Sequence, residues 1–393
     1  MPWWASWAIF FIIIFSFYGS GHYYLYTWLN RLISFSPRQR FLLKVTLGSL
    51  PLFFPLARFL ARYDFNFFTY SVALFSSLWI GFFFYFLLLA LTRDLLAVFF
   101  MLAKQKYFFS PRLGRRQVAL VIGAVLFING WAFYEAQQIS VTRIEVPLWG
   151  LSKELDGLKV VQISDVHFGM INGQEKLTEI VKMANDLFPD IVVITGDLVD
   201  ESIAHMEEMA IPLAQLQARW GIFAVTGNHE FYAGVERAVA IMQRAQVNVL
   251  RNERRILPGG LQILGIDDPT GTKRLGNPVP EVTDLFATLE PDQPSIFLCH
   301  QPIYFAEAAA HRIGLQLSGH THGGQLFPII LISRLFYPLT PGLHQQDKSY
   351  LYVSRGVGTW GPPLRLGSPP ELVLVKLRSP AILSAPRQDN LAK

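Results

Sequence analysis

The residues best suited to chemistry lie near the C-terminus, where the chain reads Gly319-His-Thr-His-Gly-Gly-Gln325 directly after the apolar run 313–317. Two histidines two residues apart at the end of a strand project to the same side, because successive side chains alternate between faces. Both imidazoles, of His320 and His322, can therefore reach one small space, and imidazole is a common metal ligand. The pair predicts part of a site for two adjacent metal ions.

Four more polar clusters come at the predicted ends of apolar strands. They are Asp165-Val-His167, Gly196-Asp197, Gly227-Asn-His-Glu230 and Cys299-His300. Open α/β sheets place their chemistry at the carboxyl ends of strands. Five of the nine histidines lie at these strand ends. Each short motif also occurs in ordinary turns, but all five in this order favour a common metal site.

The residue types indicate which metals would suit the site. Two divalent ions a few Å apart need a bridging anion, and a carboxylate serves well. Mixed imidazole, carboxylate and amide ligands suit Mn, Fe, Zn or Co rather than Ca. The glycines before Asp197, Asn228 and His320 let the backbone turn sharply close to the metals and the substrate. We therefore expect two divalent ions as cofactors.

The elements that must position these residues alternate between short strands and helices, which predicts an α/β domain at 157–378. Strands are predicted at 158–164, 190–195, 221–226, 261–266, 295–298, 313–317, 350–353 and 372–377. Helices are predicted at 174–187, 203–218 and 235–245. The segment 141–156 is expected to be a linker, and the polar segment 379–393 a flexible tail.

Composition divides the chain into two parts. It has 393 residues, 51% of them hydrophobic, which is too apolar for an ordinary soluble protein of this size. Residues 1–140 hold 12 Lys/Arg and 3 Asp/Glu, whereas the remainder holds 22 and 26. The positive charge of the first part lies between apolar runs, and the second part is mildly acidic. This distribution disfavours nucleic acid as a partner.

Long apolar runs predict that residues 1–140 form a transmembrane anchor. Four runs, at about 4–26, 41–60, 68–91 and 118–136, approach or exceed the roughly 20 residues that cross a bilayer. The run 41–60 is the weakest, because it contains Lys44, Pro51, Pro55 and Arg58. A cleaved signal peptide is disfavoured, since the first run lacks a basic segment before it and further runs follow.

Basic residues in the loops predict the orientation. Three arginines lie between the first two runs and six Lys/Arg between the last two, so both loops are expected in the cytoplasm. Four spans would then place the C-terminal domain on the outer, periplasmic face of the cell (inner) membrane. If 41–60 does not cross, this argument fails. The single cysteine, Cys299, excludes an internal disulfide and a cysteine-based zinc site.

The five motifs together resemble the calcineurin-like metallophosphoesterases over about residues 156–377. The ending Gly-His-Thr-His-Gly-Gly-Gln, with Ser354-Arg-Gly-Val-Gly358 beyond it, is most similar to the membrane-associated bacterial branch. That branch includes transmembrane proteins and enzymes that cleave the pyrophosphate of UDP-diacylglucosamine in lipid A synthesis. The resemblance implies a four-layer α/β/β/α sandwich behind about four transmembrane spans.

The resemblance also implies a role for each site residue. One metal would be held by Asp165, His167 and His322, the other by Asn228, His300 and His320, and Asp197 would bridge both. A metal-bound hydroxide would attack phosphorus in line. His229 would donate a hydrogen bond or proton to the phosphoryl or leaving oxygen, with Glu230 or a backbone group setting its tautomer.

The substrate is expected to be a phosphoester, lipid-linked or nucleotide-linked. An apolar stretch, 326–339, follows the histidine pair and is either packed on the sheet or a lip that admits a lipid. Arg334, Arg355 and Arg365 are candidates to hold a second phosphate or a head group. The alternatives are a nuclease of the same superfamily, a receptor with an inactive metal site, and a transporter. Almost no ionisable residue lies in the spans, which favours an anchor over a transporter.

Overall fold

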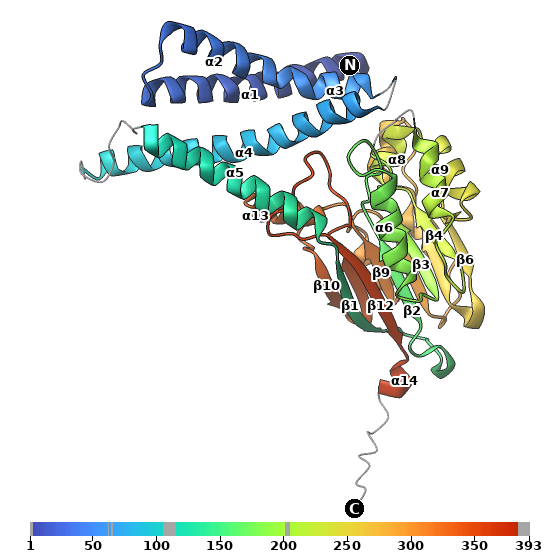
Figure 1. Ribbon diagram of the computed structural model, residues 1–393. Coiled ribbons are helices and arrows are strands. Elements are labelled where there is room, and N and C mark those ends of the chain that lie inside the picture. Colours follow the sequence, from blue (N-terminus) through green and yellow to red (C-terminus); the bar gives the residue numbers. More distant parts are fainter. Residues whose placement is uncertain (1–2, 62, 64–65, 105–114, 201–204, 384–393) are drawn as a thin grey trace, which may run out of the picture. The chain divides into compact units, whose positions relative to one another are not determined.

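The structure is a computed structural model that describes residues 3–61, 63, 66–104, 115–200 and 205–383 (Figure 1). The side chains of residues 3–15, 115 and 117 lie outside the description. The chain forms two compact units. One comprises Met1–Tyr134 with Gly361–Leu364, and the other comprises Glu135–Trp360 with Arg365–Lys393.

The first unit is helical. Its helices are α1 (Trp3–Leu32), α2 (Pro37–Ser49), α3 (Phe53–Leu60), α4 (Phe67–Leu102) and α5 (Arg115–Gln137), the last of which runs into the second unit. A 3₁₀ turn, Leu50–Leu52, separates α2 from α3. Pro51 lies in this turn, and proline cannot donate the backbone hydrogen bond that a continuous helix requires. The predicted second span is therefore two α-helices joined by a 3₁₀ turn rather than one uninterrupted α-helix.

Three helical stretches of this unit are long and apolar enough to cross a membrane. They are Pro37–Leu60, Phe67–Leu102 and Val118–Gln137. The predicted first span, 4–26, lies on α1, but its side chains up to residue 15 are outside the description. The number of four spans and the orientation therefore remain predictions.

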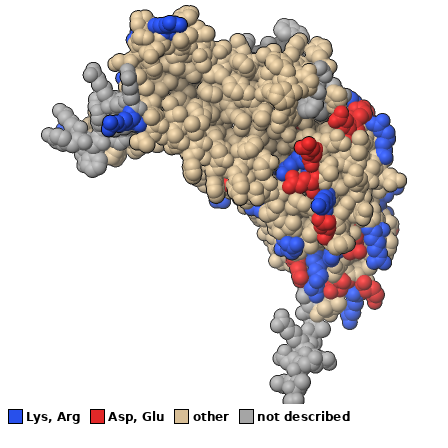
Figure 2. Space-filling view, in the orientation of Figure 1, with Lys and Arg blue, Asp and Glu red and all other residues tan. Residues whose placement is uncertain are grey.

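Small and polar contacts hold the described helices of this unit together. Helix α4 buries Ala73, Ser76, Gly81 and Ala90, and such small residues let helices in a membrane approach closely. Asp94 of α4 accepts a hydrogen bond from Arg31 of α1 at 2.7 Å. On the face shown in Figure 2 the helical unit displays wide uncharged surface, whereas the second unit carries both signs of charge.

The second unit is built on two six-stranded sheets. The first has the order β1 (Ser140–Pro147), β12 (Glu371–Arg378), β2 (Lys159–Ile163), β3 (Ile191–Thr195), β4 (Ile222–Val225) and β5 (Asn248–Val249). The second has the order β10 (Gly342–Gln346), β11 (Ser349–Val353), β9 (Leu315–Ser318), β8 (Ser295–Leu298), β7 (Gln262–Gly265) and β6 (Glu253–Ile256). In the first sheet only the β12–β2 pair is antiparallel. The second is antiparallel at both edges, β10–β11 and β6–β7.

Helices cover the outer faces of the two sheets. Those of this unit are α6 (Gln174–Asn185), α7 (Ala210–Leu213), α8 (Asn228–Ala233), α9 (Val235–Arg244), α10 (Pro269–Arg274), α11 (Val282–Phe286), α12 (Phe305–Ala310), α13 (Ile329–Phe336) and α14 (Pro380–Leu383). Figure 1 shows α6, α7 and α9 along the first sheet.

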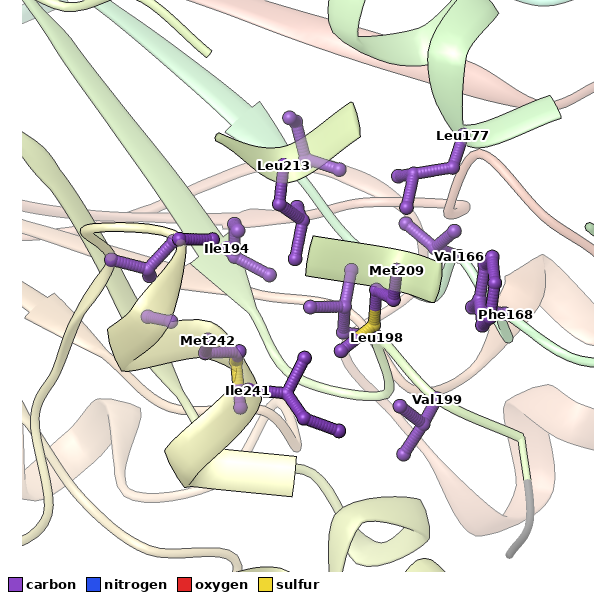
Figure 3. Close-up of a cluster of buried hydrophobic side chains, with 14 of the residues drawn as sticks. Val166, Phe168, Leu177, Ile194, Leu198, Val199, Met209, Leu213, Ile241 and Met242 are labelled. Atoms are coloured by element: carbon purple, nitrogen blue, oxygen red, sulfur yellow. The ribbon is translucent and has the colours of Figure 1, made fainter. Parts of the chain in front are cut away.

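Strand alternation divides the apolar core into layers. In β3, Val192 and Ile194 pack toward α6, α7 and α9, whereas Ile191 and Val193 pack between the sheets. Figure 3 shows the helix-facing cluster, in which Ile194 lies among Leu213, Ile241 and Met242. The second sheet repeats the pattern, with its outward side chains packed against α11 and α12. The predicted four-layer α/β/β/α sandwich is confirmed.

Two predicted elements differ from the structure. Residues 141–156, expected to be a linker, include most of strand β1, which pairs in parallel with the whole of β12. The segment 203–218, predicted as one helix, contains a 3₁₀ turn, Met206–Met209, followed by the short helix α7. Helix α7 ends one residue after Pro212. Residues 203–204 of that prediction lie outside the described residues.

Candidate metal centre

All seven predicted metal ligands lie where strands of the two sheets end. Asp165 and His167 follow β2, Asp197 follows β3, and Asn228 follows β4 at the first position of α8. His300 follows β8, and His320 and His322 follow β9. The seven residues are at most one-tenth exposed, except His320, which is partly buried. The predicted strand ends therefore do converge on one place.

One group of donor atoms is formed by Asp165, His167 and His322. The Nε2 atoms of the two histidines are 3.0 Å apart, and Asp165 Oδ1 is 3.6 Å from His322 Nε2. The ligand atoms of the three residues all lie within 4.8 Å of one another. Three buried donors that point at one small space suit a divalent ion of the transition series.

A second group is formed by Asp197, His300 and His320. His300 Nε2 lies 3.1 Å from Asp197 Oδ2 and 3.1 Å from His320 Nδ1. The same Asp197 oxygen is 3.8 Å from His167 Nε2, in the first group. Asp197 therefore stands between the two groups, as a bridging carboxylate must.

Asn228 gives an independent test of whether these residues fit a metal. Its side chain is buried, and its Oδ1 atom accepts no hydrogen bond from any described residue. A buried acceptor without a partner costs about 1–3 kcal/mol. A bound cation would satisfy this oxygen, so the donor set fits a metal centre.

The loops that carry the ligands are held in unusual backbone conformations. Five of the ligands have positive φ, between 48° and 70°: Asp165, His167, Asp197, His320 and His322. Non-glycine residues in this left-handed region cost about 1–3 kcal/mol each and concentrate at functional sites. Gly227, which precedes Asn228, lets the backbone pass close to the site as the sequence indicated, because a Cβ atom there would overlap the Asp197 carboxylate.

Hydrogen bonds from outside the cluster orient the imidazoles. His300 Nδ1 contacts the Thr195 carbonyl at 2.8 Å, which leaves Nε2 as the metal-facing atom. His320 Nε2 contacts the Tyr337 hydroxyl at 2.8 Å, which leaves Nδ1 facing His300. Partners of this kind fix which ring nitrogen carries a lone pair.

Burial and mutual attraction set the charges of the cluster. Burial by itself would raise the pKa of Asp197, but His300 and His229 outweigh it and hold the pKa well below its usual range. Burial and the neighbouring His300 lower the pKa of His320 to about 3. Burial and the Arg365 guanidinium also lower the pKa of His322, well below its usual value. An ionised Asp197 and neutral His320 and His322 are the forms that bind metals. Burial by itself would lower the pKa values of His167 and His300, but the Asp200 and Asp197 carboxylates outweigh it and raise them, so these two imidazoles would have to release a proton when a metal binds.

His229 lies beside the ligands and is oriented by the backbone rather than by Glu230. Its Nδ1 contacts the Asp200 carbonyl at 2.5 Å, so Nε2 is the atom that can exchange a proton. Burial lowers the pKa of His229. The Asp200 carboxylate also lies 3.4 Å from His229 Nδ1 and 3.5 Å from His167 Nδ1.

Glu230 holds the Asp197 loop. Its carboxylate accepts backbone N–H bonds from Asp197, Leu198, Val199 and Gly227, at 2.6 to 3.1 Å. Burial and the Asp197 carboxylate raise the pKa of Glu230 to about 7, against these four donors. Glu230 thus fixes the backbone of the loop that carries Asp197, as a positioning residue would.

Arg365 contacts the backbone of the loops around the donor groups, and its Nη2 lies 3.1 Å from His322 Nδ1. It is fully buried, and its guanidinium donates to the backbone carbonyls of His322, Arg355, Gly356, Gly358 and Ser368. Burial lowers the pKa of Arg365 to about 10, so it remains charged at neutral pH. Arg365 thus ties the 355–368 loop to the His322 loop, and its assignment to substrate binding stays a prediction.

We expect Arg365→Met to destabilise the protein strongly. The carbonyls of Arg355, Gly358 and Ser368 have no other donor among the described residues, and each unsatisfied acceptor costs about 1–3 kcal/mol. A loss of about 3 kcal/mol or more should lower the melting temperature by at least about 6 °C. Scanning fluorimetry would measure it, with the exposed Arg143→Met as control. Equal melting temperatures would contradict this role.

Two residues of the site were missed in the sequence. Asp200 lies three residues beyond Asp197 in Gly196-Asp-Leu-Val-Asp200, a spacing that could have drawn attention to a second acidic residue. Tyr337 is 17 residues from His320 in the sequence, and no local pattern connects them. Only the return of the chain after α13 brings its hydroxyl to the imidazole.

Comparisons with known proteins agree with this geometry. The family model for calcineurin-like phosphoesterases matches residues 158–324. A transmembrane protein with metallophosphoesterase domain from Bos taurus is 36% identical over 281 residues, which are 67% of this chain and 63% of the relative. An uncharacterized metallophosphoesterase from Aquifex aeolicus is 34% identical over 264 residues, which are 66% of this chain and 98% of the relative.

A dimetal phosphatase from Danio rerio of known structure has a TM-score of 0.37 and 12% identity, over 51% of this chain and 88% of its own. That similarity is too low to add to what the sheets and the sequence matches show. The two sheets with donor groups at their strand ends, together with the sequence matches, place the chain among the metallophosphoesterases. The chain belongs to the calcineurin-like phosphoesterase family.

Proposed function

We propose that the protein is a membrane-anchored, metal-dependent phosphoester hydrolase with a dinuclear centre. The observation that carries the proposal is the two donor groups that Asp197 joins; a third set of donor atoms, from His167, Asp197 and His229, lies close together as well. The spans would place the enzyme in the cell membrane as a multi-pass protein, with the catalytic unit on the periplasmic side. The chain spans 63% of the Bos taurus relative, so activity, substrate and partners are proposed for this chain by itself.

The residues of the site divide the work. Asp165, His167 and His322 would hold one ion, Asn228, His300 and His320 the other, and Asp197 both. When bound, the ions would lower the pKa of water and neutralise charge on the phosphoryl oxygens. His229 would hold or release a proton at Nε2 toward the leaving oxygen, because the Asp200 carbonyl occupies its Nδ1.

The substrate we favour is a lipid-linked or nucleotide-linked phosphodiester or pyrophosphate. Three helices long and apolar enough to cross a membrane would keep the enzyme where lipids are concentrated. Negative charge exceeds positive charge in residues 141–393, which disfavours a nuclease.

The test is metal-dependent turnover by the full chain purified in detergent. The protein would be stripped with chelator, reloaded with Mn, Fe, Zn or Co, and offered bis-p-nitrophenyl phosphate, single-stranded DNA and a membrane lipid extract read by mass spectrometry. We expect hydrolysis of the diester and of a lipid, restored by metal and absent with chelator. Cleavage of DNA alone would support the nuclease instead. No hydrolysis of any substrate with metal bound would favour a receptor and overturn the proposal.

A further inference from the structure

Helix α13 follows the histidine pair closely and leaves one side of itself exposed to solvent. None of its eight residues is buried. Leu331, Ile332, Leu335 and Phe336 are all exposed, and the last two reach 80% and 75%. Phe327 extends the same exposed apolar surface before the helix begins. We call Phe327, Leu331, Ile332, Leu335 and Phe336 the outer face. Exposed apolar surface of this kind usually marks a site that binds a ligand, a partner or a membrane.

The other side of α13 lines a polar pocket. Ile330, Ser333, Arg334 and Tyr337 recur at helical spacing and form one wall of a cavity of about 160 Å³. Thr321, Thr340 and Ser368 line it further. At roughly 30 Å³ for each water, the cavity has room for about five waters, which suits a group of the size of a phosphate.

Two guanidinium groups give the pocket a positive charge. Arg355 Nη2 is paired with the Glu371 carboxylate at 2.7 Å, but its buried Nε has no hydrogen-bond partner among the described residues. Arg334 forms no ion pair with any described residue. One carboxylate against two guanidiniums leaves a net positive charge, which favours an anionic ligand.

The pocket is built against the metal centre. Thr321 and Gly323 of its lining alternate along the chain with His320 and His322. Tyr337 lines the pocket and also contacts His320 Nε2 at 2.8 Å. Gly324 lets α13 approach this loop, because a Cβ atom there would lie 2.5 Å from the Ile330 Cα. A ligand in the pocket would therefore lie next to the loop that carries two metal ligands.

We propose that α13 and its pocket bind an anionic lipid, with the phosphate-bearing head group in the pocket and the acyl chains along the outer face. An anionic amphiphile matches both sides of the helix, whereas a nucleotide or free phosphate would leave the outer face uncovered. This inference rests on the proposed function and deepens it, because it names the lipid-linked substrates as the class that the site selects. Arg334 and Arg355 are then head-group ligands.

The test measures direct binding to the full, metal-loaded chain held in amphipol. The probe is the non-hydrolysable phosphonate analogue of dihexanoyl phosphatidic acid, compared with the same head group without acyl chains, with dihexanoyl phosphatidylcholine and with a nucleoside diphosphate. We expect the anionic lipid to bind at least about tenfold more tightly than each of the others. Equal affinity for the chain-free head group or for phosphatidylcholine, or tighter binding of the nucleotide, would overturn the proposal.

Variants separate the two sides of the helix. Arg334→Gln should weaken binding of the anionic lipid about tenfold. Leu335→Ser with Phe336→Ser should weaken it to a similar extent while binding of the chain-free head group stays unchanged. All three positions are exposed, and melting temperatures would confirm folding. Arg143→Gln and Phe188→Ser, at exposed positions elsewhere, are the matched controls and should bind as the wild type does.

These measurements remain informative whatever the catalytic assay shows. Lipid binding without diester hydrolysis would refute the proposed function and leave the binding site standing. Diester hydrolysis with unchanged lipid affinity in the Leu335/Phe336 variant would refute the binding site alone, and the outer face would then be assigned to a protein partner.

Discussion

Asp197→Asn is expected to lower kcat/KM for bis-p-nitrophenyl phosphate by more than about 100-fold. Loss of a residue that only hydrogen-bonds to a metal ligand lowers activity by about 10- to 100-fold, and loss of the ligand itself should lower it further. The reason is that Asp197 Oδ2 faces His300 of one donor group at 3.1 Å and His167 of the other at 3.8 Å. An amide has one acceptor oxygen without charge and cannot replace a carboxylate between two cations.

Metal content should fall in the same variant. Elemental analysis after reloading is expected to give two ions for each wild-type chain and fewer than two for Asp197→Asn. Asp186→Asn, an exposed position after α6, controls for the chemical change and should behave as wild type. If Asp197→Asn retained both ions and full turnover, the bridging role would be refuted.

Glu230→Gln is expected to destabilise the catalytic unit although the side chains have nearly the same shape. The Glu230 carboxylate accepts four backbone N–H bonds, and a glutamine would turn its own NH₂ group toward some of those donors. Each buried N–H group left without an acceptor costs about 1–3 kcal/mol, so we expect a loss of about 2–4 kcal/mol. The melting temperature should fall by at least about 4 °C.

Turnover by Glu230→Gln should also fall, by about 10- to 100-fold, because the released N–H groups belong to the loop that carries Asp197. Scanning fluorimetry and diester kinetics would measure both effects. Glu175→Gln, exposed in the first turn of α6, is the matched control. A stable and fully active Glu230→Gln would show that the four contacts do not position the bridging residue.

The sequence was most informative where residue type and strand end coincide. Asp165, Asp197 and His320 each follow a buried apolar run, and parallel strands bring their ends to one edge, so the cluster was predictable. Family resemblance divided the ligands between two metals, which spacing by itself does not do. Tyr337 was beyond reach, because its contact with His320 depends on how α13 packs on the Gly323–Gly324 backbone.

Edge strands were the least predictable part of the fold. β1 alternates Arg143, Ile144, Glu145 and Val146, a pattern of a half-covered strand, but its position beside the last apolar run made it resemble a connection. β10 (Gly342–Gln346) is short and polar, and only its pairing with β11 defines it. Long-range pairing, rather than local propensity, decides such strands.

The pairing of β1 determines where the catalytic unit can be separated from the helices. All eight residues from Ser140 to Pro147 pair with β12, and Ser140 N donates to the Pro370 carbonyl at 3.0 Å. A soluble fragment that started at residue 158, where the match to the family model begins, would leave one side of β12 without hydrogen-bond partners. Unpaired edges of this length promote aggregation. A stable fragment should therefore begin before Ser140, at the close of α5.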